Sequence, residues 1–125
     1  VGATILIARY IDSSNYYYFN LLRFGGDSFE LGKVVAGEAA TLSGDVTTIT
    51  QNQDYTLKLV VTGTLIEGYI NGVRVASAVD SEYSGTGSPG LSLYCPDTNL
   101  VTFNNFQVFG IVPRNVHANF FIGER

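Results

Sequence analysis

The residues that could support catalysis are few and lie scattered along the chain. Glycoside hydrolysis needs two carboxyl groups about 5–10 Å apart across the scissile bond. The glutamates lie on separate predicted elements, at Glu30, Glu38, Glu67, Glu82 and Glu124. Only the fold could bring two of them together, so we expect no catalytic carboxylate pair and no enzyme.

The single histidine and the single cysteine do not complete another catalytic or metal-binding group. A Ser-His-Asp triad would have to use His117, which lies in the atypical C-terminal segment. Cys95 precedes Pro96 at a predicted strand end, where a small buried residue is expected rather than a reactive thiol. One Cys and one His cannot build a zinc site. The sequence therefore predicts a protein without catalytic residues.

Tyrosines and amides favour carbohydrate recognition instead. Aromatic faces stack on the C–H surfaces of sugars, and nearby amides or carboxylates bind the hydroxyl groups. Residues 16–24 alternate between two faces, as a strand requires. One parity predicts a core face: Tyr17, Phe19 and Leu21. The other predicts an exposed face that could be concave: Tyr16, Tyr18 and Asn20.

Further polar residues could line the same face or its rim. The next predicted strands carry the polar or amphipathic residues Lys58, Glu67, Tyr69 and Arg74. The loop that follows offers Asp80, Glu82 and Tyr83. The candidate glycan-binding set is therefore Tyr16, Tyr18, Asn20, Lys58, Glu67, Tyr69, Arg74 and Tyr83. The alternative is that these tyrosines only cover sheet surface and edges, as Tyr ordinarily does in sandwiches.

Calcium is the one cofactor that the sequence leaves open. Ca²⁺ takes oxygen ligands from loops, and the candidates at predicted turns are Asp12, Asp80, Asp97 and Asn99. Turn chemistry alone explains Asp and Asn at these positions, and no spacing like that of an EF-hand connects them. No other cofactor is expected.

The elements that must position these residues are short β-strands. Val, Ile, Thr, Tyr and Phe dominate the periodic segments, which favours strands over helices. Strands are predicted over residues 5–10, 16–24, 29–35, 39–42, 55–62, 65–70, 73–79, 91–94 and 101–109. Asn71-Gly72 fits a two-residue type I′ turn, because both positions must reach positive φ. About eight or nine strands at hairpin spacing, without a helix, predict an all-β antiparallel sandwich or barrel.

Composition fits one globular domain. The chain has 125 residues, of which 46% are hydrophobic and 14% charged, enough for a single core and too few for a second module. A net charge of −4 without a Lys/Arg cluster argues against a nucleic-acid partner. The sequence contains no run of about 18 apolar residues, so no membrane-spanning helix is predicted. A single cysteine cannot form an intrachain disulfide, which leaves the redox compartment open.

A series of short motifs runs through residues 5–109. They are Arg9-Tyr10-x-Asp12-x-x-Asn15-Tyr16-Tyr17, Tyr55-x-Leu57-x-Leu59, Tyr69-Ile70-Asn71-Gly72-Val73, Asp80-x-x-Tyr83, Gly87-x-x-Gly90-Leu91 and Val101-x-Phe103-Asn104-Asn105-Phe106-x-Val108. In this order they resemble the concanavalin A-like lectin/glucanase superfamily, particularly its laminin-G-like jelly rolls. The resemblance implies an antiparallel jelly-roll sandwich of the kind found in extracellular and phage minor tail or fibre proteins. Hydrolytic members carry two glutamates a few residues apart on one strand, which this chain lacks.

Two departures from the family pattern matter. Family domains are usually longer, with strands before the Arg9-Tyr10 segment, so we expect those strands to be missing and the open edge to be completed by another part of the protein or a neighbouring subunit. Family members often have Asp where this chain has Asn104, which puts a metal role there in doubt.

The predicted organisation is a jelly-roll domain over residues 1–110 and a C-terminal tail or linker over residues 111–125. Pro113 interrupts the second segment, and apolar bulk follows it near the terminus. The chain opens in strand-like material at Val1 without an initiator Met or signal peptide, so we expect a fragment or a processed piece.

Two functions follow as expectations. The first is a non-catalytic module of a larger extracellular or phage tail protein that binds glycans or cell-envelope polysaccharide. The alternative is a structural or assembly module of a virion, in contact with other protein subunits and forming a homo-oligomer, with a glycosidase a distant third. The expected location is the virion or the extracellular space, and the sequence does not specify the ligand.

Overall fold

The computed structural model describes residues 2–23, 26–85, 87–94, 101–109 and 114–122, with the backbone alone at 94, 101–105, 109 and 114–122. These residues form the strands β1 (Gly2–Asp12), β2 (Asn15–Arg23), β3 (Asp27–Val35), β4 (Glu38–Val46), β5 (Gln53–Thr62), β6 (Leu65–Ile70), β7 (Val73–Val79), β8 (Ser88–Tyr94), β9 (Val101–Phe109) and β10 (Arg114–Ile122). Within the same ranges, no helix is long and apolar enough to cross a membrane.

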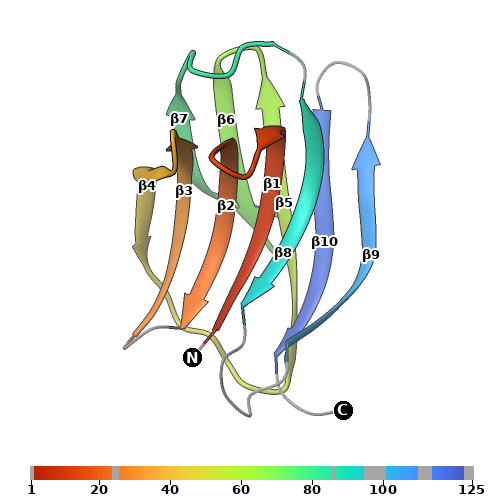
Figure 1. The fold of residues 1–125 in the computed structure, drawn as a ribbon. Helices are drawn as coiled ribbons and strands as arrows, with labels where there is room; N and C mark the ends of the chain where they lie inside the picture. The colour runs from red at the N-terminus through yellow and green to blue at the C-terminus, as the bar shows by residue number, and fades with distance from the viewer. Residues whose placement is uncertain (1, 24–25, 86, 95–100, 110–113, 123–125) are drawn as a thin grey trace.

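The strands form two five-stranded antiparallel sheets that pack face to face (Figure 1). The first sheet has the order β4-β3-β2-β1-β8, and the second has the order β7-β6-β5-β10-β9. The predicted all-β antiparallel sandwich is therefore confirmed.

The core lies between the sheets and follows the alternation of the strands. Tyr17, Phe19 and Leu21 of β2 belong to the buried core cluster together with Leu57 and Leu59 of β5. The predicted core parity of residues 16–24 is thus confirmed. The sheets approach closely at Gly68 of β6, because a Cβ there would overlap the Phe19 ring. The aromatic ring therefore packs directly on the backbone of the opposite sheet.

The tight turns match the turn residues of the sequence. Asn71 and Gly72 have φ values of 51° and 82°, as the predicted type I′ turn requires. The β1–β2 turn is closed by Asp12, whose Oδ1 accepts hydrogen bonds from the Ser14 N–H and the Asn15 amide, both at 2.8 Å. The strand ends on either side of Asn71-Gly72 agree with the predicted ones, whereas β1 runs on to Asp12 and β2 already begins at Asn15, beyond the predicted ends.

Residues 114–122 correct the predicted C-terminal tail. They form β10, which lies inside the second sheet between β5 and β9. Val116, Ala118 and Phe120 pair with Leu59, Leu57 and Tyr55. The period-2 alternation of a strand was present in the sequence after Pro113, and the strand begins at Arg114.

All ten described strands come from this chain. The outer strands are β4 and β8 in the first sheet and β7 and β9 in the second. No described strand pairs with the outer side of β8 or β9. The expectation that another part of the protein or a neighbouring subunit completes an edge therefore stays a prediction.

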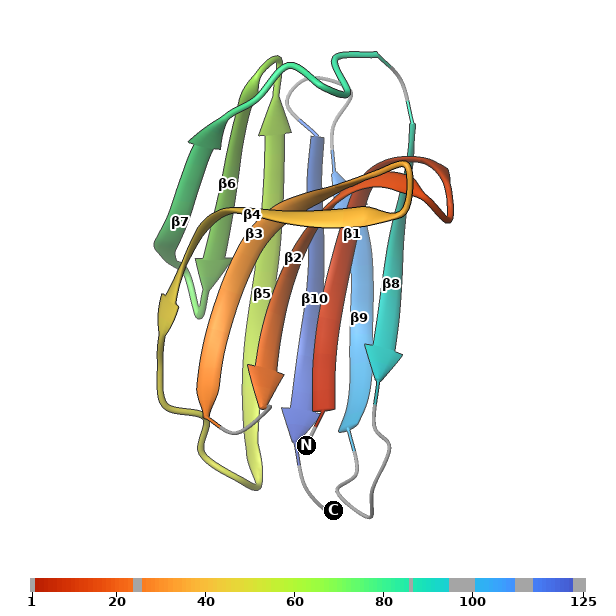
Figure 2. The same cartoon turned by 60° about the vertical axis from the view of Figure 1, so that its left-hand side comes forward.

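The first sheet bends at one end. Its register shifts between Ala8 and Asp12 of β1 and between Leu31 and Gly32 of β3, and such bulges kink a strand. Arg9, inside the first irregularity, has a φ of 50°. Figure 2 shows the β1–β2 and β3–β4 hairpins leaning outward at their turns, away from the second sheet. The outer face of the first sheet is therefore concave.

Candidate functional site

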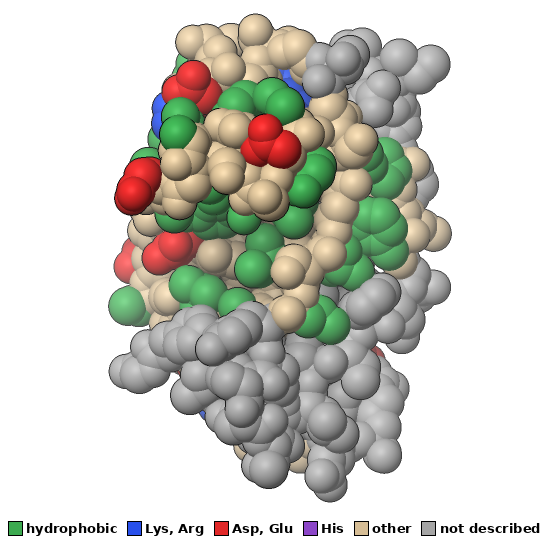
Figure 3. Space-filling model, viewed as in Figure 1, with side chains coloured by type: hydrophobic (Ala, Val, Ile, Leu, Met, Phe, Trp, Pro, Cys, Tyr) green, Lys and Arg blue, Asp and Glu red, His purple; other side chains and the backbone are tan. Residues whose placement is uncertain are grey.

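Strand β2 places three polar or aromatic residues on the outer face of the first sheet, opposite its core residues. Tyr18 lies between Ile7 of β1 and Gly32 of β3. Asn20 lies between Ile5 and Glu30 in the same way. We call the following residues of this surface the tyrosine face: Tyr10, Tyr16, Tyr18, Asn20 and Glu30. Figure 3 views this side of the molecule and shows hydrophobic side chains across its middle and acidic ones toward β4.

The three tyrosine rings contact one another in a row. The rings of Tyr10 and Tyr16 have centroids 5.8 Å apart and planes inclined by 28°. Tyr16 and Tyr18 meet edge to face at 6.5 Å. Tyr10 is 37% exposed and Tyr16 is half-buried, so the run offers ring surface to solvent at the concave end of the sheet.

Tyr10 was missing from the predicted set because strict alternation places it on the core side with Leu6 and Ala8. The register shift after Ile7 and the positive φ of Arg9 turn it to the outer face instead. The Tyr16-Tyr17 pair was the sequence signal that could have included Tyr10. Neighbouring residues of a strand lie on opposite faces, so one of these two tyrosines had to lie on the outer face, where it could contact Tyr10.

Tyr18 and Asn20 correct the predicted exposure of this face. Tyr18 is only 6% exposed and Asn20 only 7%. The Tyr18 ring reaches across β3 above Gly32, where a Cβ would overlap its phenol group, and it hydrogen-bonds the Thr41 side chain of β4. Burial, together with the nearby Glu30 carboxylate, raises the pKa of Tyr18. The curvature of the sheet crowds these side chains, so they form the floor of the face rather than its rim.

Asn20 is the floor residue with unused hydrogen-bonding capacity. Its Oδ1 is buried and has no hydrogen-bond partner. Buried amide oxygens are normally paired, because desolvation of an unpaired acceptor is costly. Glu30 stands beside it on β3 and is half-buried. The unpaired Asn20 oxygen therefore lies next to the Glu30 carboxylate at one end of the row of tyrosines.

The second group of predicted site residues lies on the other side of the sandwich. The Lys58 Nζ stands 4.1 Å from the Tyr69 ring centroid. Arg74 pairs with Glu67 at 3.2 Å, and the Tyr69 hydroxyl donates to the same carboxylate at 3.3 Å. The structure brings these four residues together on the outer face of the second sheet and separates them from Tyr16, Tyr18 and Asn20. The predicted single surface is thus two surfaces.

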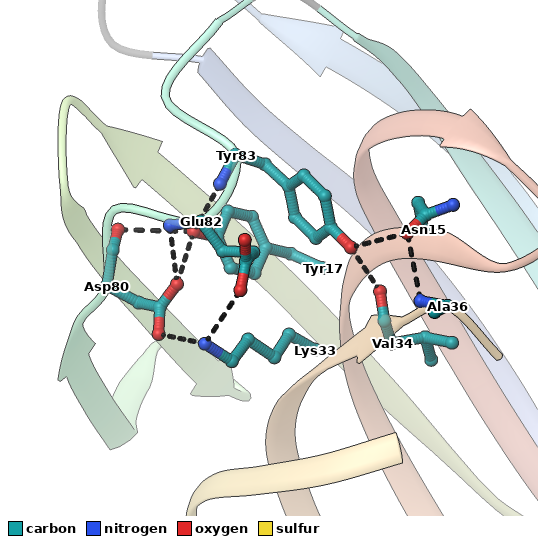
Figure 4. Close-up of polar contacts among 8 residues, drawn as sticks. All are labelled: Asn15, Tyr17, Lys33, Val34, Ala36, Asp80, Glu82 and Tyr83. Atoms are coloured by element: carbon teal, nitrogen blue, oxygen red, sulfur yellow. Dashed lines mark hydrogen bonds and ion pairs between the residues drawn. The ribbon is translucent and has the colours of Figure 1, made fainter. Parts of the chain in front are cut away.

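Tyr83 is a core residue and not part of a glycan-binding rim. It is 8% exposed, and its ring packs edge to face on Tyr17 at 5.1 Å. Its hydroxyl donates to the Val34 carbonyl, and its N–H donates to the Tyr17 hydroxyl at 3.0 Å (Figure 4). The β7–β8 loop is therefore fastened to the first sheet through this ring, which leaves no free aromatic face for a sugar.

Asp80 completes this fastening, which we call the latch: Tyr17, Lys33, Asp80 and Tyr83. The Tyr17 hydroxyl donates to Asp80 Oδ1 at 2.7 Å, and Lys33 Nζ lies 2.8 Å from Oδ2. Burial opposes the charge of Asp80, but the hydrogen bonds from Lys33 and Tyr17 outweigh it and lower its pKa. The bond to Asp80 raises the pKa of Lys33, and burial raises that of Tyr17 to about 12.

The calcium candidates are not assembled by the described part of the chain. Asp12 closes the β1–β2 turn and Asp80 is paired with Lys33, whereas Asp97 and Asn99 lie outside the described residues. The described residues contain no group of three or more His, Cys, Asp or Glu side chains that could hold a metal ion. Calcium binding stays a prediction.

Glu30, Glu67 and Glu82 lie at three separate places in the structure. Glu30 lies on the outer face of the first sheet and Glu67 on that of the second, with the core between them. Glu82 accompanies Asp80 at Lys33. The backbone of His117 pairs with Lys58 inside the second sheet. Cys95 and Glu124 lie outside the described residues.

Comparison with known proteins adds one finding. No protein-family model and no curated protein matches the chain. Among solved structures, it is similar to the carbohydrate-binding module CBM66 from Bacillus subtilis, with 23% sequence identity and a TM-score of 0.63. The match covers 98% of this chain and 65% of that chain, so the chain spans just under two thirds of the module's length. The likeness establishes the shared β-sandwich fold.

Proposed function

We propose that this chain is a non-catalytic carbohydrate-binding module and that the tyrosine face is its binding surface. The observation that carries the proposal is the continuous run of Tyr10, Tyr16 and Tyr18 beside the unpaired Asn20 amide oxygen. A sugar ring needs a flat apolar surface for its C–H groups and acceptors for its hydroxyl groups at the edge. The tyrosine face offers exposed ring surface at Tyr10 and Tyr16, and acceptors beside it at Glu30 and, on the floor, at Asn20.

The similarity to a carbohydrate-binding module supports carbohydrate binding, because a protein with a similar fold bears that name. The second-sheet surface suits a ligand less well. Its Lys58 ammonium covers the Tyr69 ring, and its Arg74 and Glu67 charges are paired with each other. A sugar would have to displace these contacts before it could stack. An extracellular or virion setting, contacts with other subunits and a homo-oligomer remain expectations from the sequence.

Affinity electrophoresis through gels that contain neutral plant, fungal and bacterial polysaccharides tests the proposal. The wild-type protein is expected to be retarded by at least one polysaccharide. Tyr16→Ala is expected to weaken that retention at least fivefold, because it removes the central ring of the aromatic run. Tyr69→Ala is the matched control on the second sheet and should leave retention unchanged. Absence of retention throughout the panel, or equal loss in both variants, would overturn the proposal.

A further inference from the structure

We infer that the Asn20–Glu30 end of the tyrosine face selects uncharged or amino sugars and rejects acidic glycans. This inference rests on the proposed function and specifies the ligand class of the same site. It follows from the Glu30 carboxylate, which lies on this face, and from the Lys and Arg side chains, which lie elsewhere.

None of the Lys and Arg side chains that the structure describes lies on the tyrosine face. The Arg9 guanidinium donates to the Gly63 carbonyl at 2.7 Å, toward the second sheet. Arg23 pairs with Asp27 at 3.2 Å, and Lys33 pairs with Asp80 in the latch. The other three Lys and Arg residues of the described strands belong to the second sheet: Lys58, Arg74 and, with its backbone alone described, Arg114. No described Lys or Arg is therefore available on the tyrosine face to neutralise an anionic ligand.

Glu30 is the charge that remains on this face. It stands in register with Asn20 on β3 and is half-buried. No ion pair between described residues involves its carboxylate. A carboxylate without a cation accepts hydrogen bonds from hydroxyl, N–H and ammonium groups, and it repels another anion strongly where the surroundings exclude water.

Asn20 adds a second acceptor at the same place. Its amide oxygen has no partner in the free protein, so a ligand donor that reaches it makes a bond that the protein lacks. The terminal torsion of an asparagine is soft, which allows the amide to turn its oxygen toward a ligand. Two neighbouring acceptors match the paired hydroxyl groups of a sugar, and the Glu30 carboxylate repels a carboxylate or a sulfate.

Matched pairs of polymers test the inference: hydroxyethyl cellulose against carboxymethyl cellulose, dextran against dextran sulfate, and chitosan oligosaccharides as the cationic probe. We expect the wild-type protein to bind the neutral member of a pair at least tenfold more tightly than the anionic member. Glu30→Gln should narrow that ratio at least threefold, since it keeps the shape and removes the charge. Glu67→Gln on the second sheet is the control and should leave the ratio unchanged.

The possible results separate the inference from the proposed function. Equal or tighter binding of the anionic member, or a ratio that Glu30→Gln does not alter, overturns the inference and leaves carbohydrate binding intact. Binding to no polymer of any pair, chitosan included, overturns both. A ratio that falls in Glu30→Gln while neutral binding persists supports both.

Discussion

Replacing Tyr17 with phenylalanine tests the latch that holds the β7–β8 loop on the first sheet. The ring is fully buried and stays in the variant, so only one oxygen is lost. That oxygen accepts the Tyr83 N–H at 3.0 Å and donates to Asp80 Oδ1 at 2.7 Å. A buried donor left unpaired costs about 1–3 kcal/mol, and a hydrogen bond to a charged group contributes about 1.5–3 kcal/mol. Because the two losses overlap, we expect the free energy of unfolding to fall by about 2–4 kcal/mol.

Urea unfolding followed by far-ultraviolet circular dichroism measures this loss, since the chain has no tryptophan. An unchanged m value in urea shows that the unfolded state is unaltered. In thermal unfolding of a domain of this size, each kcal/mol of lost stability lowers Tm by about 4 °C. Tyr69→Phe removes a longer bond of 3.3 Å on the second sheet and should cost less than about 0.5 kcal/mol. A Tyr17→Phe variant as stable as this control would refute the latch.

Three further predictions follow from the same contacts. The stability that Asp80 contributes is fully present above its ordinary unfolded pKa and is lost as pH falls through its lowered folded pKa, so urea midpoints should drop as the pH falls below about 4, and Asp80→Asn should flatten that drop. Asn20→Leu should keep or raise the urea midpoint, because it removes an unpaired buried acceptor, and yet weaken polysaccharide retention at least threefold; retention equal to wild type would count against the Asn20 contact. Gly68→Ala should cost about 1–3 kcal/mol through overlap with Phe19, whereas Gly90→Ala, whose new Cβ meets Ile7 at an ordinary 3.5 Å, should be nearly neutral in the same assay.

The hairpins and the core parity were predictable because they depend on local chemistry. Asn71-Gly72 defines its turn through positive φ, and the alternation around Phe19 predicts which side of β2 is buried. Strand β10 was missed because Pro113 and several polar residues precede its alternating apolar positions. Only pairing with β5, more than 50 residues away in the sequence, identifies it as an interior strand.

The site was predictable only in part, because it depends on how strands are assigned to sheets. Alternation correctly grouped Tyr16, Tyr18 and Asn20, but it cannot tell that Lys58 and Tyr69 belong to the opposite sheet. The burial of Tyr18 and Asn20 depends on the curvature of the first sheet. Bulges produce this curvature, and the composition of the sequence does not reveal it. Tyr83 resembled a rim residue in the sequence, and its insertion between the sheets depends on hydrogen bonds to residues distant in the chain.

The tyrosine face as the glycan-binding surface is tested most directly by amide chemical-shift mapping. A ¹⁵N-labelled sample is titrated with an oligosaccharide of the polysaccharide that retains the protein best. We expect the largest shifts at the amides of Tyr16, Tyr18 and Glu30, with the amides of Lys58 and Tyr69 unmoved. Shifts concentrated at Lys58 and Tyr69 would contradict the assignment of the surface.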